Sequence, residues 1–311
     1  MNSALQVLLH TDLLISKLIN YVNINNLNII NKFIELAKGI NKIESTEIEN
    51  KYIIKSYSPV EFLNTFYNLH SLFRDGQQDA IEFIRIFLSD ISNETNISNT
   101  TYKEFLYEDL SKKELSKKYN EHYLSRENSI VTDIYYTQII NIFTCTCGRQ
   151  SYPFQKLLDI PLLIPEKMRE VNLDILIEKF LSEIVVDLND NCLYCKKKRE
   201  KIKKIMKFDI LNHIIIFSIQ RIDPFASIKN NTIIKYDEII SLKKFKDESS
   251  LEDKVNYKLF ATIHHNGNLN SGHYYSLINI ENKWFEFNDS NVAVLDNFNF
   301  NSSNVSVFFY R

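Results

Sequence analysis

Two groups of side chains in this sequence have types and spacings that can do chemistry, and the first is a set of four cysteines. Cys145 and Cys147 flank one threonine in FTCTCGRQS, and Cys192 and Cys195 form a C-x2-C pair in DNCLYCKKK. Two close pairs about 45 residues apart, each in a turn-like context, are typical of a zinc ion held by four thiolates. Such an ion would join two hairpin tips that have little core of their own. The alternative is four reduced, partly buried thiols at strand ends.

The second group lies near the C-terminus, in NSGHYYSLINIENKWFEFNDSNV. His273 begins an alternating run, and a short turn at Glu281–Asn282 returns the chain to Asn288 and Asp289. This hairpin predicts that Asn288 or Asp289 lies beside His273. A histidine with an amide or carboxylate neighbour is the base half of a nucleophilic triad. The alternative is a packed, hydrogen-bonded histidine in an aromatic strand.

The elements that position these groups change character along the chain. Residues 2–19, 58–69 and 75–91 carry apolar positions at helical spacing, so we expect three helices. Asn2 or Ser3 is placed to cap the first helix, and Ser58 with Pro59 to begin the second. Residues 91–130 are polar with weak periodicity and predict a connection with some helix in it.

The second half is dominated by strand signals. Its short runs of β-branched and aromatic residues are IVTDIYYTQIINIFTC, NHIIIFSIQR, NYKLFATIHHN, HYYSLINI, KWFEFND and VSVFFYR. Residues 185–207 and the polar stretch 223–255 interrupt them. Helices first and strands afterwards predict an α+β fold in which a helical lobe packs on an antiparallel sheet.

The overall charge of the chain argues against nucleic acid as a partner. The net charge is −2 and the pI is near 6.4, so no global field attracts nucleic acid or an anionic membrane. The one dense basic run, residues 196–207, alternates charges with apolar residues and contains no aromatic residue to stack on bases. We interpret it as an exposed hairpin with one covered face. A zinc-ribbon module that binds nucleic acid through this run is a remote alternative.

The sequence carries no membrane or secretion signal. No stretch approaches the roughly 18 consecutive apolar residues of a membrane span, and the first residues lack a basic region and a cleavage site. Four cysteines are too few for a disulfide scaffold of this size. We therefore expect a protein of the cytosol or nucleus that has no membrane partner.

Seven segments resemble motifs of one family, the ubiquitin-specific proteases, in the same order and over nearly the whole chain. They are MNSALQVLLH, GQQDAIEFIRIFL, CTCGRQSYPFQKLLDIPLLIP, NCLYCKKK, HIIIFSIQRI, YKLFATIHHNGNLNSGHYYSLI and KWFEFNDSNV. The first resembles the end of the family's cysteine box, the third and fourth its two zinc knuckles, and the last two its histidine box. Several ordered motifs of this length make chance resemblance very improbable.

The resemblance implies an architecture and a partner. The family fold is papain-like, with a helical thumb, a palm of antiparallel sheet and fingers of zinc-knuckle β hairpins, and the fingers grip ubiquitin. Residues 1–311 would form a single catalytic domain, incomplete at the N-terminus. The thumb would be mainly helical over residues 1–130, and fingers and palm would interleave over residues 131–311. We expect a monomer with a structural zinc ion that binds ubiquitin or ubiquitinated proteins.

The resemblance also implies roles for individual residues. His273 matches the general base and Asn288 the residue that orients it, with Asp289 as a possible substitute. Asp79 and Glu82 match positions that hold the arginine-rich tail of ubiquitin, and carboxylates in a narrow channel bind guanidinium groups bidentately. Tyr274 is a candidate wall of that channel. The alternatives are an ordinary solvated helix face for the two acids and a core position for Tyr274.

The family's nucleophile has no counterpart in this sequence. Aligned on Met-Asn-Ser, the cysteine would stand two residues before Met1, and the family's oxyanion-stabilising asparagine would lie further upstream. All four cysteines present belong to the zinc pattern. We favour an active enzyme whose sequence is truncated here at the N-terminus, because the chain starts on the methionine of the cysteine box and retains His273 and Asn288. The alternative is a pseudoenzyme that binds ubiquitin without cutting it, and in either case this polypeptide is expected to be inactive.

Overall fold

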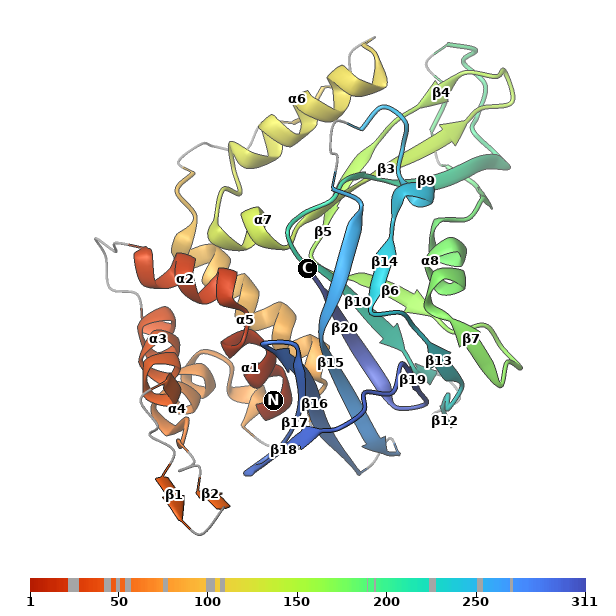
Figure 1. Ribbon diagram of the computed structural model, residues 1–311. Helices are drawn as coiled ribbons and strands as arrows, with labels where there is room; N and C mark the ends of the chain where they lie inside the picture. The colour runs from red at the N-terminus through yellow and green to blue at the C-terminus, as the bar shows by residue number, and fades with distance from the viewer. Residues whose placement is uncertain are drawn as a thin grey trace.

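The computed structural model in Figure 1 contains three parts, which we call thumb, palm and fingers. The structure describes residues 1–311 except 22–27, 42–45, 49–50, 54–56, 75–77, 99–103, 107–109, 189, 193, 224–227, 251–253 and 269–270. The thumb helices lie on one side of the palm sheet, and the fingers extend from its opposite end (Figure 1). The predicted α+β class with a helical thumb, a sheet palm and β-stranded fingers is confirmed.

The thumb consists of the helices that precede the first long strand. Its helices are α1 (Asn2–Leu9), α2 (Asp12–Asn20), α3 (Asn28–Asn41), α4 (Val60–Leu69), α5 (Ala80–Thr95), α6 (Lys112–Leu124) and α7 (Ile130–Ile134), with the short 3-10 helix η1 (Ser71–Phe73) and the hairpin β1 (Thr46–Ile48) and β2 (Lys51–Ile53). No helix in the described ranges has the length and apolar character needed to cross a lipid bilayer.

The single helix predicted over residues 2–19 is wrong, because α1 ends at Leu9 and α2 starts at Asp12. The hydroxyl of Thr11 donates to the Val7 carbonyl (2.9 Å), and His10 Nδ1 donates to the carbonyl of Gln6 (2.8 Å). The N–H of Thr11 donates to the Leu8 carbonyl (3.2 Å), so its hydroxyl satisfies the Val7 carbonyl that a longer helix would bond through the backbone, and the chain turns there.

The predicted side-chain caps at the first two helices are also wrong. Met1 is the N-cap of α1 and Pro59 that of α4, and neither cap makes a side-chain hydrogen bond. Asn2 and Ser3 instead lie inside α1, and Ser58 precedes the cap of α4. Neighbouring elements therefore set the first turns of these helices rather than local capping.

Residues 28–134 contain more helix than we predicted. The sequence pattern missed α3, and the connection predicted over residues 91–130 contains α6, which begins with a capping box of Ser111 and Glu114. The strand predicted from residue 130 starts later, because residues 130–134 form α7. The helix predicted from residue 75 begins at Ala80, and residues 75–77 lie outside the described residues.

The palm is an eight-stranded sheet in the order β18-β17-β16-β15-β20-β10-β6, with β14 paired to β15. All pairs are antiparallel except β10 with β6. Its strands are β6 (Ile160–Leu163), β10 (Ile215–Gln220), β14 (Ile239–Ser241), β15 (Asn256–Gly267), β16 (Gly272–Ile280), β17 (Lys283–Asn288), β18 (Asn291–Leu295) and β20 (Val305–Tyr310).

Alternation along the palm strands divides the interior into two cores. In β20, Val307 and Phe309 face the thumb helices, whereas Phe308 and Tyr310 face the opposite side. That opposite side is covered by α8 (Leu173–Leu181) and by a small sheet of β7 (Glu170–Asn172), β13 (Ile233–Lys235) and β19 (Asn301–Ser302). The central palm strands β10, β15 and β20 are therefore buried on both faces, whereas the edge strand β18 is mostly exposed.

The fingers are a five-stranded sheet with a small core. Their strands are β3 (Thr137–Thr144), β4 (Gln150–Ser151), β5 (Phe154–Leu157), β8 (Ile184–Val186) and β9 (Ile202–Ile210). The basic run of residues 196–207 lies, as predicted, on one arm of a hairpin. Residues 202–207 belong to β9, which pairs with β3 and β8, and the antiparallel bridge between Asn191 and Lys198 continues the pairing beyond β8. The remaining short elements are β11 (Ile222–Asp223), β12 (Ile228–Lys229) and η2 (Lys243–Phe245).

Candidate active site and thiol cluster

The hairpin β16–β17 brings His273 and Asn288 together. Its turn residues Glu281 and Asn282 have φ angles of 49° and 64°, the left-handed values that a tight two-residue hairpin turn requires. Ser276 pairs with Phe287 in the register, so His273 lies near the end of β17. The His273 Nε2 and Asn288 Oδ1 atoms are 2.6 Å apart.

A second bond orients the amide of Asn288. Its Nδ2 donates to Oε1 of Glu286 at 3.2 Å, so the amide oxygen is turned towards His273. Because an amide oxygen only accepts, the bonded Nε2 of His273 carries the proton and Nδ1 keeps its lone pair. The sequence analysis missed Glu286, although it precedes Asn288 by two residues on the same face of β17.

Asp289 lies further from the histidine than Asn288 does. Its Oδ2 is 3.9 Å from His273 Nε2, and its Oδ1 accepts a hydrogen bond from Asn2 Nδ2 at 3.3 Å. The φ of Asp289 is 53°, so the chain leaves β17 in a left-handed turn. Asp289 thus connects the hairpin to the first turn of α1.

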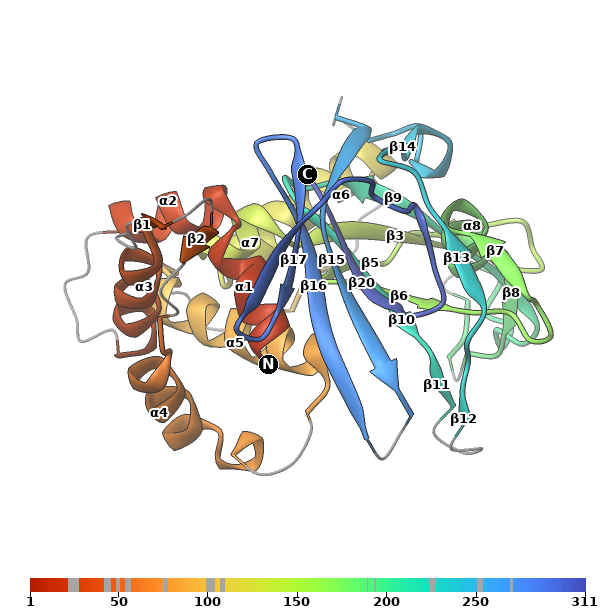
Figure 2. The ribbon, with the colours of Figure 1, turned by 60° about the horizontal axis from the view of Figure 1, so that its bottom comes forward.

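The N-terminal end of α1 is directed at this histidine. Figure 2 shows α1 and the N-terminus beside β16 and β17. Met1, Asn2, His273 and Asp289 all line one pocket of about 250 Å³, which also includes Tyr274. A helix N-terminus favours negative charge, so this place is suited to a thiolate or an oxyanion.

Asp79 and Glu82 follow Gln78, a lining residue of this pocket, at the start of α5. Asp79 is the N-cap, and its Oδ1 accepts from the backbone N–H groups of Ile81 (2.8 Å) and Glu82 (3.3 Å). Its Oδ2 accepts from the Tyr274 hydroxyl of β16 at 3.2 Å. Glu82 is exposed in the first turn. The thumb and palm therefore meet through Asp79 and Tyr274. The carboxylate of Glu82 lies about one helical turn further along α5.

The ring of Tyr274 packs against a neighbouring palm residue, His265. Its ring lies 4.5 Å from the ring of His265, centre to centre. A Cβ atom on Gly272 would come within 1.9 Å of His265 Nε2, so only glycine allows this packing. Burial, followed by the Asp79 carboxylate, raises the pKa of Tyr274 above its usual value, which keeps its hydroxyl a donor. Burial and the nearby Lys229 lower the pKa of His265.

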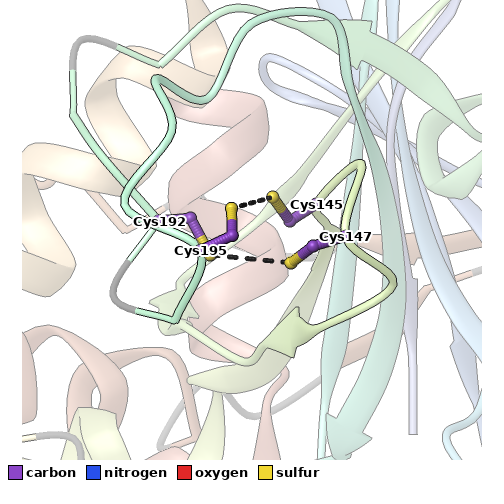
Figure 3. Close-up of side chains that lie close together, drawn as sticks. All are labelled: Cys145, Cys147, Cys192 and Cys195. Carbon is purple, nitrogen blue, oxygen red and sulfur yellow. Dashed lines mark hydrogen bonds between the residues drawn. The ribbon is translucent and has the colours of Figure 1, made fainter.

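The four cysteines gather together beside the β3–β4 turn of the fingers (Figure 3), and Figure 1 shows β4 far from β16 and β17. The Sγ atoms of Cys145 and Cys195 are 3.9 Å apart, as are those of Cys147 and Cys192, and all four lie within 4.8 Å of one another. These distances exclude disulfide bonds, which are about 2.05 Å long. Zinc–sulfur bonds of about 2.3 Å place tetrahedral thiolates roughly 3.8 Å apart, so the cluster fits one zinc ion.

Each cysteine pair lies in a tight backbone turn. Gly148 has a φ of 83°, and its N–H donates to the Cys145 carbonyl at 2.9 Å. Lys196 donates in the same way to the Cys192 carbonyl at 2.9 Å. The backbone N–H groups of Cys195 and Tyr194 donate to the thiol of Cys192 and lower its pKa to about 6.

A family sequence model and curated relatives match the chain. The model described as "Ubiquitin carboxyl-terminal hydrolase" matches residues 1–310. Ubiquitin carboxyl-terminal hydrolase Usp2 of Drosophila melanogaster is 27% identical over 100% of this chain and 33% of its own length. Ubiquitin carboxyl-terminal hydrolase 2 of Gallus gallus is 30% identical over 82% of this chain and 74% of its own. The chain thus spans a third of the fly relative.

Solved structures share the fold. A SAGA DUB module bound to monoubiquitin matches with a TM-score of 0.73 and 17% identity, over 100% of this chain and 66% of that chain. The SAGA Ubp8/Sgf11/Sus1/Sgf73 DUB module bound to ubiquitin aldehyde matches with a TM-score of 0.71 and 18% identity, over the same shares. The family model and the curated relatives, rather than these folds, carry the assignment. The chain belongs to the ubiquitin carboxyl-terminal hydrolase family, as its resemblance to the ubiquitin-specific proteases predicted.

Proposed function

We propose that this chain is the core of a cysteine-type deubiquitinase, which hydrolyses the isopeptide or peptide bond after the C-terminal glycine of ubiquitin. The observation that carries this proposal is the pair of His273 and Asn288, 2.6 Å apart, beside the N-terminal end of α1. Ubiquitin-bound structures of the same fold support ubiquitin as the partner. We further propose that the protein works in the cytosol or nucleus and binds ubiquitin as a monomer.

In the proposed reaction a cysteine thiolate at the N-terminal end of α1 attacks the glycine carbonyl. Nδ1 of His273 accepts the thiol proton and later gives it to the leaving lysine amine. Asn288 holds the imidazole in the tautomer that leaves Nδ1 free, and Glu286 holds the amide of Asn288. Water then hydrolyses the thioester and releases ubiquitin.

We propose that the tail of ubiquitin lies between α5 and β16. Glu82 and Asp79 supply carboxylates for its arginines, and Tyr274 forms the opposite wall. Charge-assisted hydrogen bonds of this kind are stronger than neutral ones and favour planar guanidinium groups. The acidic start of α5 thus provides the specificity for a basic, extended peptide.

The cysteine cluster is proposed to hold a structural zinc ion through Cys145, Cys147, Cys192 and Cys195. The sulfur spacing fits tetrahedral coordination. A bound ion would supply no catalytic chemistry there, because all four of its ligand positions are taken by the chain. It would tie the β3–β4 turn to the loop before β9.

We propose that this 311-residue polypeptide binds ubiquitin but makes no covalent bond to it. All four of its cysteines lie in the fingers cluster, and none lines the pocket of His273. A ubiquitin-binding pseudoenzyme is therefore the second candidate function. Both candidates predict binding, and they differ in whether the His273 site activates a thiol supplied to it.

Reaction with a ubiquitin that carries a C-terminal electrophile tests the covalent chemistry. The chain as given should form no adduct by mass spectrometry. A variant extended by Cys-Tyr before Met1 should react and should lose the reaction in the background of His273→Ala. A His273-dependent adduct on the unextended chain would refute the claim that this polypeptide lacks a nucleophile. An extended variant that forms no adduct would favour the pseudoenzyme.

Binding of unmodified ubiquitin tests the tail channel. Glu82→Gln removes one proposed contact with an arginine, and such charged hydrogen bonds contribute about 1.5–3 kcal/mol, so the Kd should rise at least about tenfold. Glu61→Gln on α4 makes the same charge change on an exposed first turn and should leave the Kd unchanged. Equal effects of the two variants would contradict the channel. Nucleic-acid affinity that responds to Glu82→Gln would contradict it as well.

A further inference from the structure

Helix α5 touches the palm at a second place, six residues beyond Asp79. Arg85 Nε donates to Asp159 Oδ1, and its Nη2 donates to Asp159 Oδ2, both at 2.8 Å. Asp159 stands between β5 and β6, where the chain enters the palm. The parallel geometry of the two bonds is the bidentate fork that binds a carboxylate most specifically.

The carboxylate end of this pair is rigid. The side chain of Asp159 is only 6% exposed, and its Oδ2 also accepts from the Ser218 hydroxyl at 2.5 Å. Ser218 is buried in β10 and pairs with Pro161 of β6. Two palm strands therefore fix the position of the carboxylate, and Arg85 ties α5 to that fixed point.

The two α5–palm contacts lie on either side of Glu82. Asp79, Glu82 and Arg85 are three residues apart, so they share one side of the helix, and Asp79 and Arg85 are separated by about 9 Å along its axis. Asp79 meets the palm through Tyr274, and Arg85 meets it through Asp159. The distance between α5 and the palm is thus set by one contact before Glu82 and by one contact after it.

The pair also controls the charge beside Glu82. Hydrogen bonding to Asp159 raises the pKa of Arg85, and the nearby carboxylates of Asp79 and Glu82 add to the effect. An arginine three residues after a glutamate is an ordinary intrahelical ion-pair partner for it. Asp159 holds the Arg85 guanidinium in a different direction, and among the described residues no side chain forms an ion pair with Glu82.

We propose that Arg85 and Asp159 are positioning residues of the ubiquitin-tail channel: their pair fixes α5 against the palm and keeps Arg85 from masking Glu82. The inference rests on the proposed function for its ligand. Without Asp159, Arg85 would turn to Glu82 and compete with an arginine of the substrate. Loss of Asp159 alone should therefore weaken ubiquitin binding more than loss of Asp159 and Arg85 together. A pair with a purely structural role would not give this order.

The test measures the Kd for ubiquitin in Asp159→Asn, in Arg85→Gln and in the double variant. Asp159→Asn should raise the Kd by about tenfold, a coupling typical of residues in one hydrogen-bonded network. The double variant should bind more tightly than Asp159→Asn and about as well as Arg85→Gln, because both lose the anchor of α5 but neither keeps the competing cation. A double variant that binds as weakly as Asp159→Asn, or an Asp159→Asn variant that binds normally, would overturn the inference.

Asp12→Asn provides the matched control. Asp12 of α2 accepts from Arg311 Nη1 at 3.2 Å, so it also joins thumb to palm through an arginine, but on the exposed surface away from the channel. This variant should leave the Kd unchanged. A tenfold loss here would show that any weakened thumb–palm contact lowers affinity, which would overturn a specific role for Asp159.

Hydrogen exchange separates this inference from the proposed function. In Asp159→Asn the backbone amides of the first two turns of α5 should exchange about tenfold faster than in the unchanged protein, with or without ubiquitin. Unchanged exchange would overturn the positioning role even if ubiquitin binds. Faster exchange in a protein that binds no ubiquitin would support the positioning of α5 and refute the proposed ligand.

Discussion

The fingers and the thumb–palm body of this protein are stabilised by different forces. The palm sheet has a hydrophobic core on each face, and the thumb core includes a cluster of aromatic rings at Phe33, Phe62, Phe66, Phe83 and Phe87. Between α6 and the fingers strands β3 and β5, a small buried cluster consists of Leu115, Ile140 and Phe154. Four thiols gather beyond that cluster, at the tip of the fingers.

This difference separates the candidate active site from the thiol cluster. His273, Asn288 and Asp79 stand on elements that pack into the large cores, so their geometry requires no ion. The two cysteine turns at the tip of the fingers lie outside the buried clusters, and a thiolate-bound ion would join them where no apolar core does. The protein therefore combines a candidate active site on elements with a large hydrophobic core and a fingers region that carries a four-thiol cluster.

Removal of the metal should have the largest effect and should be confined to the fingers. Cys192→Ser is expected to abolish stoichiometric zinc binding, because it removes one of the four thiolates that the proposed tetrahedral site requires. Hydrogen exchange should increase in β4, in β8 and in the loop before β9, while β15 and β16 keep their protection. Loss of protection throughout the palm would contradict the separation of the two regions.

A cavity in the thumb core should give the opposite pattern. Phe87 is fully buried, so Phe87→Ala should lower the free energy of unfolding by about 3–5 kcal/mol. Denaturant unfolding measures this change, and zinc content should remain one ion per chain. Leu72→Ala, at a side chain that is 86% exposed, is the control and should change stability by less than about 0.5 kcal/mol. Zinc loss in Phe87→Ala would show that the two regions are not separable.

His264 should make the palm sensitive to acid. Burial, followed by the nearby Arg221, lowers its pKa from 6.5 to about 3, and its ring nitrogens bond Thr262 and Ser302. The unfolded chain therefore takes up the proton first as pH falls. The contribution of neutral His264 to the free energy of unfolding is fully present above pH 6.5. It decreases as pH falls from 6.5 to 3, by up to about 1.4 kcal/mol per pH unit.

The dependence of denaturant midpoints on pH, compared with His264→Gln, measures this effect. The variant should be less stable at pH 7 and should have a flatter profile between pH 6.5 and 4. The ring of Tyr275 stacks on His264 and stays neutral over this range, so it adds no slope of its own. Identical slopes in the two proteins would exclude His264 as the source.

The exposed ion pairs of the fingers should contribute least. Lys203 Nζ lies 2.9 Å from Glu183 Oε1, with the two side chains 62% and 43% exposed. Lys203→Ala should change stability by less than about 0.5 kcal/mol and by still less at high salt, because solvent and ions screen the pair. A change above about 1 kcal/mol would mean that surface charge, rather than the thiol cluster, supports this edge.

Local patterns predicted the parts of the site that lie close together in the chain. His273 and Asn288 are 15 residues apart, and a two-residue turn brings them together whatever surrounds the hairpin. The C-x2-C pair likewise lies within one turn. Periodicity failed at residues 10–11, where α1 ends early because the N–H of Thr11 donates to Leu8 and its hydroxyl bonds the Val7 carbonyl. Helical spacing alone does not reveal such a bond.

The motifs of the sequence were enough to identify the family, the hairpin of the histidine and the four grouped cysteines, because each depends on residues that are close along the chain. The proposed tail channel, in contrast, depends on contacts between residues that are far apart in the chain. Asp79 reaches Tyr274 across 195 residues, and Arg85 reaches Asp159 across 74. These contacts exist only because both cores pack the thumb and palm into one arrangement, since burial is set by the whole fold rather than by local spacing.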